Sequence, residues 1–234
     1  MTTVRVAASL LLISTFPMFS QQTDVRQFNY YAGYAFLYSP HVGLWENGFQ
    51  TQFGYQPKTW LAVGFDYSIS TGTLTLTPGL LPLALQQQLA AQLAALAAAG
   101  QLPPGYMLAV PATSLSQTFA AGPQLAYRHF KKVTLFARPS VGAIRERATP
   151  HPKDPIAQAV ANQLAPGGNK INWTGFYGFG YGFDIIVTPR FGWRTQGDLV
   201  WDHLFNDILR DGRWTTRFST GPFFNFGKNI AGTK

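Results

Sequence analysis

The chain has no cysteine, which excludes disulfide bonds, thiolate chemistry and cysteine-ligated metals. It is also poor in charge, because only 12% of its 234 residues are Asp, Glu, Lys or Arg, whereas soluble domains average about 25%. Beyond the N-terminal segment there is no clean apolar run of the ~20 residues that a membrane-spanning helix needs. The composition therefore fits neither a soluble domain nor a helical membrane protein.

Aromatic residues are abundant, at 15% of the chain, and they alternate with small residues. In "WTGFYGFGYGFDIIV" (Trp173–Val187), aromatic or aliphatic residues occupy most odd positions, while Gly178, Gly180, Gly182 and Asp184 lie between them. Successive side chains of a strand point to opposite faces, so one face is aromatic and the other nearly bare. A wall between lipid and a narrow lumen needs this pattern. The structural alternative, a soluble lipocalin-like barrel, would need far more charge on its outer face.

The alternation recurs in eight segments, namely 27–38, 48–55, 60–70, 115–129, 133–147, 173–187, 191–203 and 213–227. The second, fourth and sixth segments end in the short connections "QPKT", "FKK" and "TPR", whereas the other connections are longer, at roughly 9, 45, 25 and 10 residues. The sequence predicts an all-β protein, an eight-stranded antiparallel transmembrane β-barrel with periplasmic turns and termini and extracellular loops. Pro123, Pro139 and Pro222 lie inside strands, where we expect bulges to accommodate them.

Residues 1–20 read as a signal peptide, with Arg5 before the apolar segment "VAASLLLISTFPMF" and Ser20 close to the expected cleavage site. The alternatives for this segment are a short buried helix or an inner-membrane anchor. The barrel is expected over residues 21–228, with loop insertions at about 72–114 and 147–171, and a tail at 229–234.

The net charge of +8 raises the question of nucleic acid. The basic residues are scattered rather than clustered, so we expect no nucleic-acid partner. Scattered cations suit the anionic groups of outer-membrane lipid and lipopolysaccharide.

The pattern resembles the small eight-stranded outer-membrane barrels of the outer-membrane protein A-like class over residues 24–228. The resemblance rests on "YYAGYAFLYS", "GFQTQFGYQPKTWLAVGFDYS", "AAGPQLAYRHFKKVTLFARPSVGA", the glycine-rich sixth segment and "FSTGPFFNFG". It implies a monomer in the outer membrane with a structural or surface-interacting role. It also implies a terminal aromatic signal for the barrel assembly machinery, which here is Phe226, followed by "GKNIAGTK".

Two long connections contain predicted amphipathic helices. "LLPLALQQQLAAQLAALAAAG" carries one apolar stripe, and "IAQAVANQL", after Asp154 as N-cap, carries a second. We expect these stripes to pack on each other, on the barrel rim or on a surface partner, although alanine-rich padding in a tolerant loop is the alternative. The stripes consist of Leu85, Leu89, Leu93 and Leu96, and of Ile156, Val160 and Leu164.

Strand parity places seven charged side chains inside the barrel: Asp66, Arg128, Arg138, Asp184, Arg194, Asp198 and Arg217. In a narrow lumen these charges must pair with one another. The network is either purely structural or a gated ion path.

A third possibility is a lipid A-modifying enzyme that uses His41, His151 or His203 with Glu46 and Ser39, but no motif spacing links these residues. We therefore predict a non-enzymatic outer-membrane barrel with no cofactor and no metal, which has a structural or surface-interaction role. The alternative is a small gated ion channel.

Overall fold

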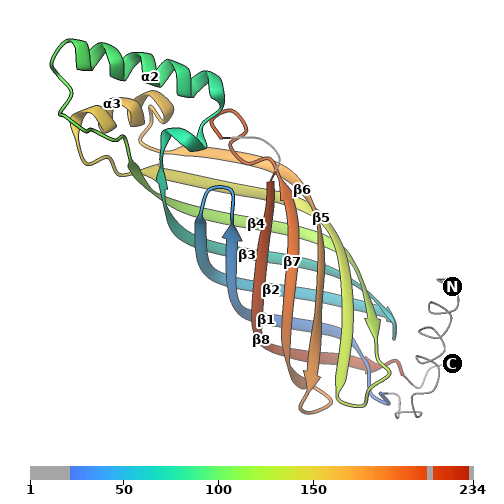
Figure 1. The fold of residues 1–234 in the computed structure, drawn as a ribbon. Helices are drawn as coiled ribbons and strands as arrows, with labels where there is room; N and C mark the ends of the chain where they lie inside the picture. Colours follow the sequence, from blue (N-terminus) through green and yellow to red (C-terminus); the bar gives the residue numbers. More distant parts are fainter. Residues whose placement is uncertain (1–21, 210–212, 232–234) are drawn as a thin grey trace, which may run out of the picture.

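The computed structural model describes residues 22–209 and 213–231, so the predicted signal peptide lies outside the described residues. The chain forms one closed antiparallel barrel in which each strand pairs with its sequence neighbours and β1 pairs with β8 (Figure 1). The predicted fold class is confirmed. The strands are β1 (Arg26–Ser39), β2 (Leu44–Lys58), β3 (Leu61–Leu76), β4 (Val110–Tyr127), β5 (Val133–Pro150), β6 (Lys170–Ile186), β7 (Phe191–Asp202) and β8 (Arg213–Asn229).

The two ends of the barrel differ. At the loop end, the β3–β4 connection contains η2 (Pro78–Leu80) and α2 (Leu83–Ala98), and the β5–β6 connection contains α3 (Pro155–Leu164). Figure 1 shows both helices above this end and the turns that join β2 to β3, β4 to β5 and β6 to β7 at the other, which we call the turn end. The helix α3 begins where Asp154 accepts a hydrogen bond from the backbone N–H of Ala157, at 2.8 Å.

Several expected strand ends were wrong. The strands β3, β4 and β5 run further toward the loop end, so the inserted loops are shorter, at 77–109 and 151–169. The first connection is a tight turn at 40–43, because β2 already begins at Leu44. The turn expected at "QPKT" lies at Thr59–Trp60, since β2 continues to Lys58.

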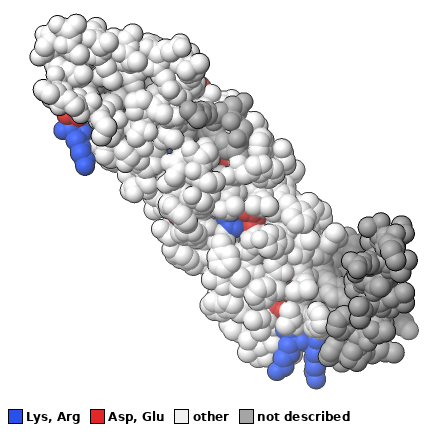
Figure 2. Space-filling view, viewed as in Figure 1, with Lys and Arg blue, Asp and Glu red and all other residues white. Residues whose placement is uncertain are grey.

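The outer wall carries an apolar band. The side chains of Tyr177, Phe179 and Tyr181 in β6 are 56%, 49% and 57% exposed. Figure 2 shows Lys and Arg at the two ends and an almost uncharged wall between them. Such a band is typical of a lipid-facing barrel surface. Within the described part of the chain, no helix has the length and hydropathy to cross a membrane.

The outer surface changes at the loop end of β3–β5. Thr71, Thr73 and Thr75 on β3 point outward, and the outward Arg147 on β5 lies in the same region. We call this polar extension of β3–β5 the tall wall. The opposite side is lower, because β1 and β2 turn back at residues 40–43.

The expected bulges at the three prolines were wrong. Pro123 and Pro139 lie opposite each other, and the pairing of β4 with β5 keeps the same register on both sides of them, from Ala121 with Val141 to Leu125 with Ala137. Pro222 lies within an unshifted stretch of the β1–β8 pairing. The missing N–H donors therefore interrupt the ladder locally without inserting a residue.

Candidate functional site

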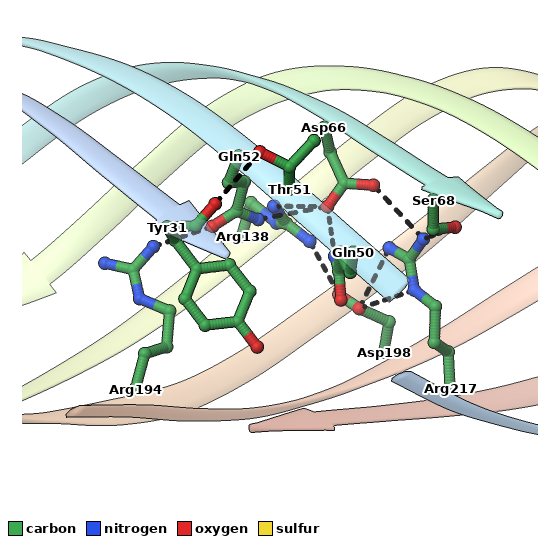
Figure 3. Close-up of polar contacts among 10 residues, drawn as sticks. All are labelled: Tyr31, Gln50, Thr51, Gln52, Asp66, Ser68, Arg138, Arg194, Asp198 and Arg217. Carbon is green, nitrogen blue, oxygen red and sulfur yellow. Dashed lines mark hydrogen bonds and ion pairs between the residues drawn. The ribbon is translucent and has the colours of Figure 1, made fainter. Parts of the chain in front are cut away.

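Four charged side chains from four strands form a ring in the middle of the lumen. Asp66 contacts Arg138 at 3.3 Å and Arg217 at 3.1 Å, and Asp198 contacts the same two arginines at 3.0 Å each. All four are buried. Figure 3 shows the four side chains converging inside the barrel, with ion pairs joining neighbours. We call this cluster the central ring. Its two carboxylates and two guanidinium groups have a net charge of zero.

Neutral groups add hydrogen bonds to the central ring, although Arg138 Nε has no partner within the described residues. The amides of Gln50 and Gln52 donate to Asp66 Oδ2, the latter over 3.1 Å. The Ser68 hydroxyl accepts from Arg217 Nη1 at 2.9 Å. The sequence analysis selected only charged residues and therefore missed these three, although they face the lumen as the charged residues do. The alternation of each strand already places them inside the barrel, and this could have identified them.

A second ion pair lies closer to the turn end. Arg194 donates two hydrogen bonds to Asp184, from Nε at 2.7 Å and from Nη2 at 2.8 Å. Its Nη1 donates to Gln52 Oε1 at 2.6 Å, which links this pair to the central ring. The guanidinium carbon also lies 4.8 Å from the ring centroid of Phe136. A bidentate pair held against an aromatic ring is geometrically specific.

Arg128 lies at the turn-end mouth, just after β4, and its recorded contacts are not with carboxylates. Its guanidinium donates to Gln56 Oε1 at 2.8 Å, to Thr134 Oγ1 at 3.1 Å and to the Thr59 carbonyl at 2.8 Å. Of the seven charged side chains predicted to face the lumen, six thus form ion pairs in the structure, and the seventh, Arg128, lies among neutral acceptors.

Glu46 was expected in an outer connection near the histidines, and that placement was wrong. It is a fully buried residue of β2, above the central ring on the loop-end side. Its carboxylate accepts hydrogen bonds from Ser114 and Ser116, the latter at 2.9 and 3.0 Å. Strand β2 begins earlier than expected, and this turns Glu46 into the lumen.

The remaining candidates for lipid A chemistry do not form one site, because His151 and His203 do not line the loop-end cavity that Ser39 and His41 share. Ser39 shares a 3.0 Å hydrogen bond with Thr215, and His151 Nε2 lies 3.0 Å from Thr113 Oγ1. His203 Nε2 accepts from the Trp201 indole at 3.2 Å. Each thus has a neighbour other than Glu46. No group of three potential ligands that could hold a metal occurs within residues 22–209 and 213–231.

The two loop helices form a cap over the loop end. Leu89 of α2 and Val160 of α3 belong to one buried cluster with Val110 at the start of β4. Leu85, Leu93 and Leu164 pack against this cluster, whereas Leu96 and Ile156 line a separate groove between the helices. The helices therefore contact both each other and the barrel rim.

A hydrogen bond ties the two long connections together. The Tyr106 hydroxyl donates to Asp154 Oδ1 at 2.9 Å. Burial and the neighbouring Asp154 carboxylate raise the pKa of Tyr106 to about 12. The backbone N–H of Ala157 lowers the pKa of the Asp154 carboxyl, and the Tyr106 hydroxyl lowers it further. Both shifts favour the state in which a neutral phenol donates to a carboxylate.

Several solved structures are similar to this barrel. Neisserial surface protein A has a similar crystal structure, with a TM-score of 0.50 and 11% identity, covering 85% of this chain and 96% of that one. The fold is that of the small eight-stranded outer-membrane barrels. Ail of Yersinia pestis (TM-score 0.48, 10% identity, 86% of this chain and 100% of that one) and OprG of Pseudomonas aeruginosa (0.46, 9%, 89% and 99%) are further matches. No protein-family model and no curated protein sequence matches.

Proposed function

We propose that this protein is a non-enzymatic outer-membrane β-barrel with a structural or surface-interaction role. The observation that carries this proposal is the lumen. The central ring, the Arg194–Asp184 pair and the contacts of Arg128 fill it at successive levels with side chains that bind one another. A barrel closed in this way anchors its loops but has no free lumen for a solute.

The loop end is the part of the molecule suited to contacts outside the cell. In the proposed orientation it is extracellular, and the turn end with both termini is periplasmic. The cap is ordered by its own apolar cluster and by the Tyr106–Asp154 hydrogen bond. The exposed Arg147 on the tall wall suits lipopolysaccharide phosphates. We expect a monomer that enters the membrane through the barrel assembly machinery.

A small gated ion channel is the second candidate, and one observation favours it. Each carboxylate of the central ring contacts both arginines, so a pair can exchange partners without leaving a charge alone. Such an exchange could open a narrow path at low cost. A lipid A-modifying enzyme is the third and weakest candidate, since Glu46, His151 and His203 do not line the cavity that Ser39 and His41 share.

Two measurements test the proposal. Folded barrels migrate differently on a gel before and after boiling, so the membrane fraction should contain a heat-modifiable band. Planar-bilayer recordings should then show no discrete conductance for the parent or for Asp184→Asn. Discrete conductance altered by Asp184→Asn would establish the channel instead, and release of acyl chains from added lipid A would establish the enzyme.

A further inference from the structure

The inner face of the barrel changes character just below the cap. On the loop-end side of the polar lumen, the inward positions become apolar: Leu74 and Leu76 follow Ser70 on β3, and Ala148 follows Glu146 on β5. On β4 the inward residues beyond Ser114 are Ala112 and Val110, both buried. The filled polar lumen therefore ends below an apolar chamber.

Three separate connections cover this chamber. The helix α3 contributes Val160, Ala161 and Leu164, and the β1–β2 turn contributes Val42. The β7–β8 connection contributes a set of large apolar side chains, which are Leu204, Phe205, Ile208 and Leu209. These side chains leave a cavity of about 90 Å³ among them. Protein interiors rarely contain voids much larger than a water molecule, so this space is unusual.

The chemistry of the lining defines the ligand. Most of it is aliphatic, with two aromatic rings, those of Phe205 and His41. The polar groups include Glu146, Asp202 and Thr215, and Thr215 donates to Asp202 Oδ2 at 3.0 Å. The ammonium group of Lys170 is paired with Asp207. Two carboxylates, one paired cation and the His41 imidazole give no excess of positive charge, which disfavours an anionic ligand. Apolar cavities of ~150 Å³ bind benzene, so this smaller cavity matches a short alkyl group, and a single ring fits when the lining side chains move outward.

We propose that this cavity is a binding site for a small neutral hydrocarbon group, such as one aromatic ring or a short alkyl chain. The central ring closes the lumen beneath the chamber, so the ligand is held at the loop end rather than passed through. Entry requires movement of the roof connections, which come from separate parts of the chain. The proposal does not depend on whether the barrel conducts ions.

Fluorobenzene provides the test, by ¹⁹F NMR on the full chain in phosphatidylcholine nanodiscs, with empty nanodiscs as the reference for lipid partitioning. The parent should show a saturable bound signal that octanol displaces and octanoate does not. Ala148→Leu and Ala161→Leu, which fill the cavity from β5 and from α3, should each weaken binding about tenfold or more. Ala143→Leu is the matched control, because it adds the same side chain to the outer face of β5.

Heat-modifiability of each variant establishes that its barrel is folded before binding is compared. A signal no larger than that of empty nanodiscs, or one unchanged in both folded filling variants, would overturn the site. Equal displacement by octanoate and octanol would overturn the neutral ligand class. Neither result would affect the proposed function, which is decided by conductance and lipid A assays.

Discussion

Removal of one carboxylate from the central ring gives the most direct measure of what holds the lumen together. Asp198→Asn leaves Arg138 and Arg217 sharing the single carboxylate of Asp66, with one excess positive charge at a level where all four groups are buried. Breaking a buried ion pair on one side costs about 3–5 kcal/mol. We expect a loss of this size in the free energy of unfolding, measured with urea in lipid vesicles.

A second substitution separates charge imbalance from lost packing. Arg138→Gln in the Asp198→Asn background restores neutrality and leaves the 3.1 Å contact between Asp66 and Arg217. The double variant should therefore be more stable than the sum of the single losses implies, by about 0.5–3 kcal/mol. Asp24→Asn is the matched control, because its pair with Arg26 is partly exposed and such pairs contribute about 0–1 kcal/mol. Additive losses, or a loss for Asp198→Asn no larger than for the control, would refute the reasoning.

Three further predictions concern the wall and the cap. Phe179→Arg should lower the free energy of unfolding by about 2–4 kcal/mol, because it places a charge on the lipid face, and parental stability would contradict that assignment. The Tyr106 contribution to stability should be complete below pH 10 and fade as the pH rises toward 12, whereas the Asp154 contribution should fade only as the pH falls through its lowered pKa. Ultraviolet titration should show a late-ionising phenol that Tyr106→Phe removes. Deletion of residues 80–100 should leave a heat-modifiable barrel, and protease added to intact cells should cut this segment in the parent. Cleavage only after the periplasm is opened would mean that the orientation is inverted.

The strands and their faces could be predicted because alternation is a local property of the sequence. The large side chain of Phe179 indicates the lipid face and the small Gly180 indicates the lumen. Asp184 is an even number of positions from Gly180, so it faces the lumen too. Some pairs were also accessible in this way, since Asp184 lies directly opposite Arg194 and Asp198 directly opposite Arg217 in adjacent strands. Register set by a short turn is enough to bring such neighbours together.

Other features depend on closure of the whole barrel. Asp66 and Arg217 are 151 residues apart and meet across the lumen, which no local pattern indicates. The loop-end extension of β3 was not predicted, because its inward positions hold Leu74 and Leu76 where small or polar residues were expected. The alternation of Thr with Leu in "TGTLTLT" was nonetheless a usable strand signal, since β-branched residues favour strands.

The tall wall also has a mechanical consequence. From Thr71 to Leu76, β3 rises by about 17 Å along its own axis beyond the region of alternating aromatic residues. It supports the cap through Leu76 and Val110, which pack with residues of both helices. A bilayer that thins, thickens or tilts around the apolar band can therefore shift relative to the barrel while α2, α3 and the rim keep their mutual positions. We therefore expect changes in bilayer thickness or tilt to leave the arrangement of the cap unchanged.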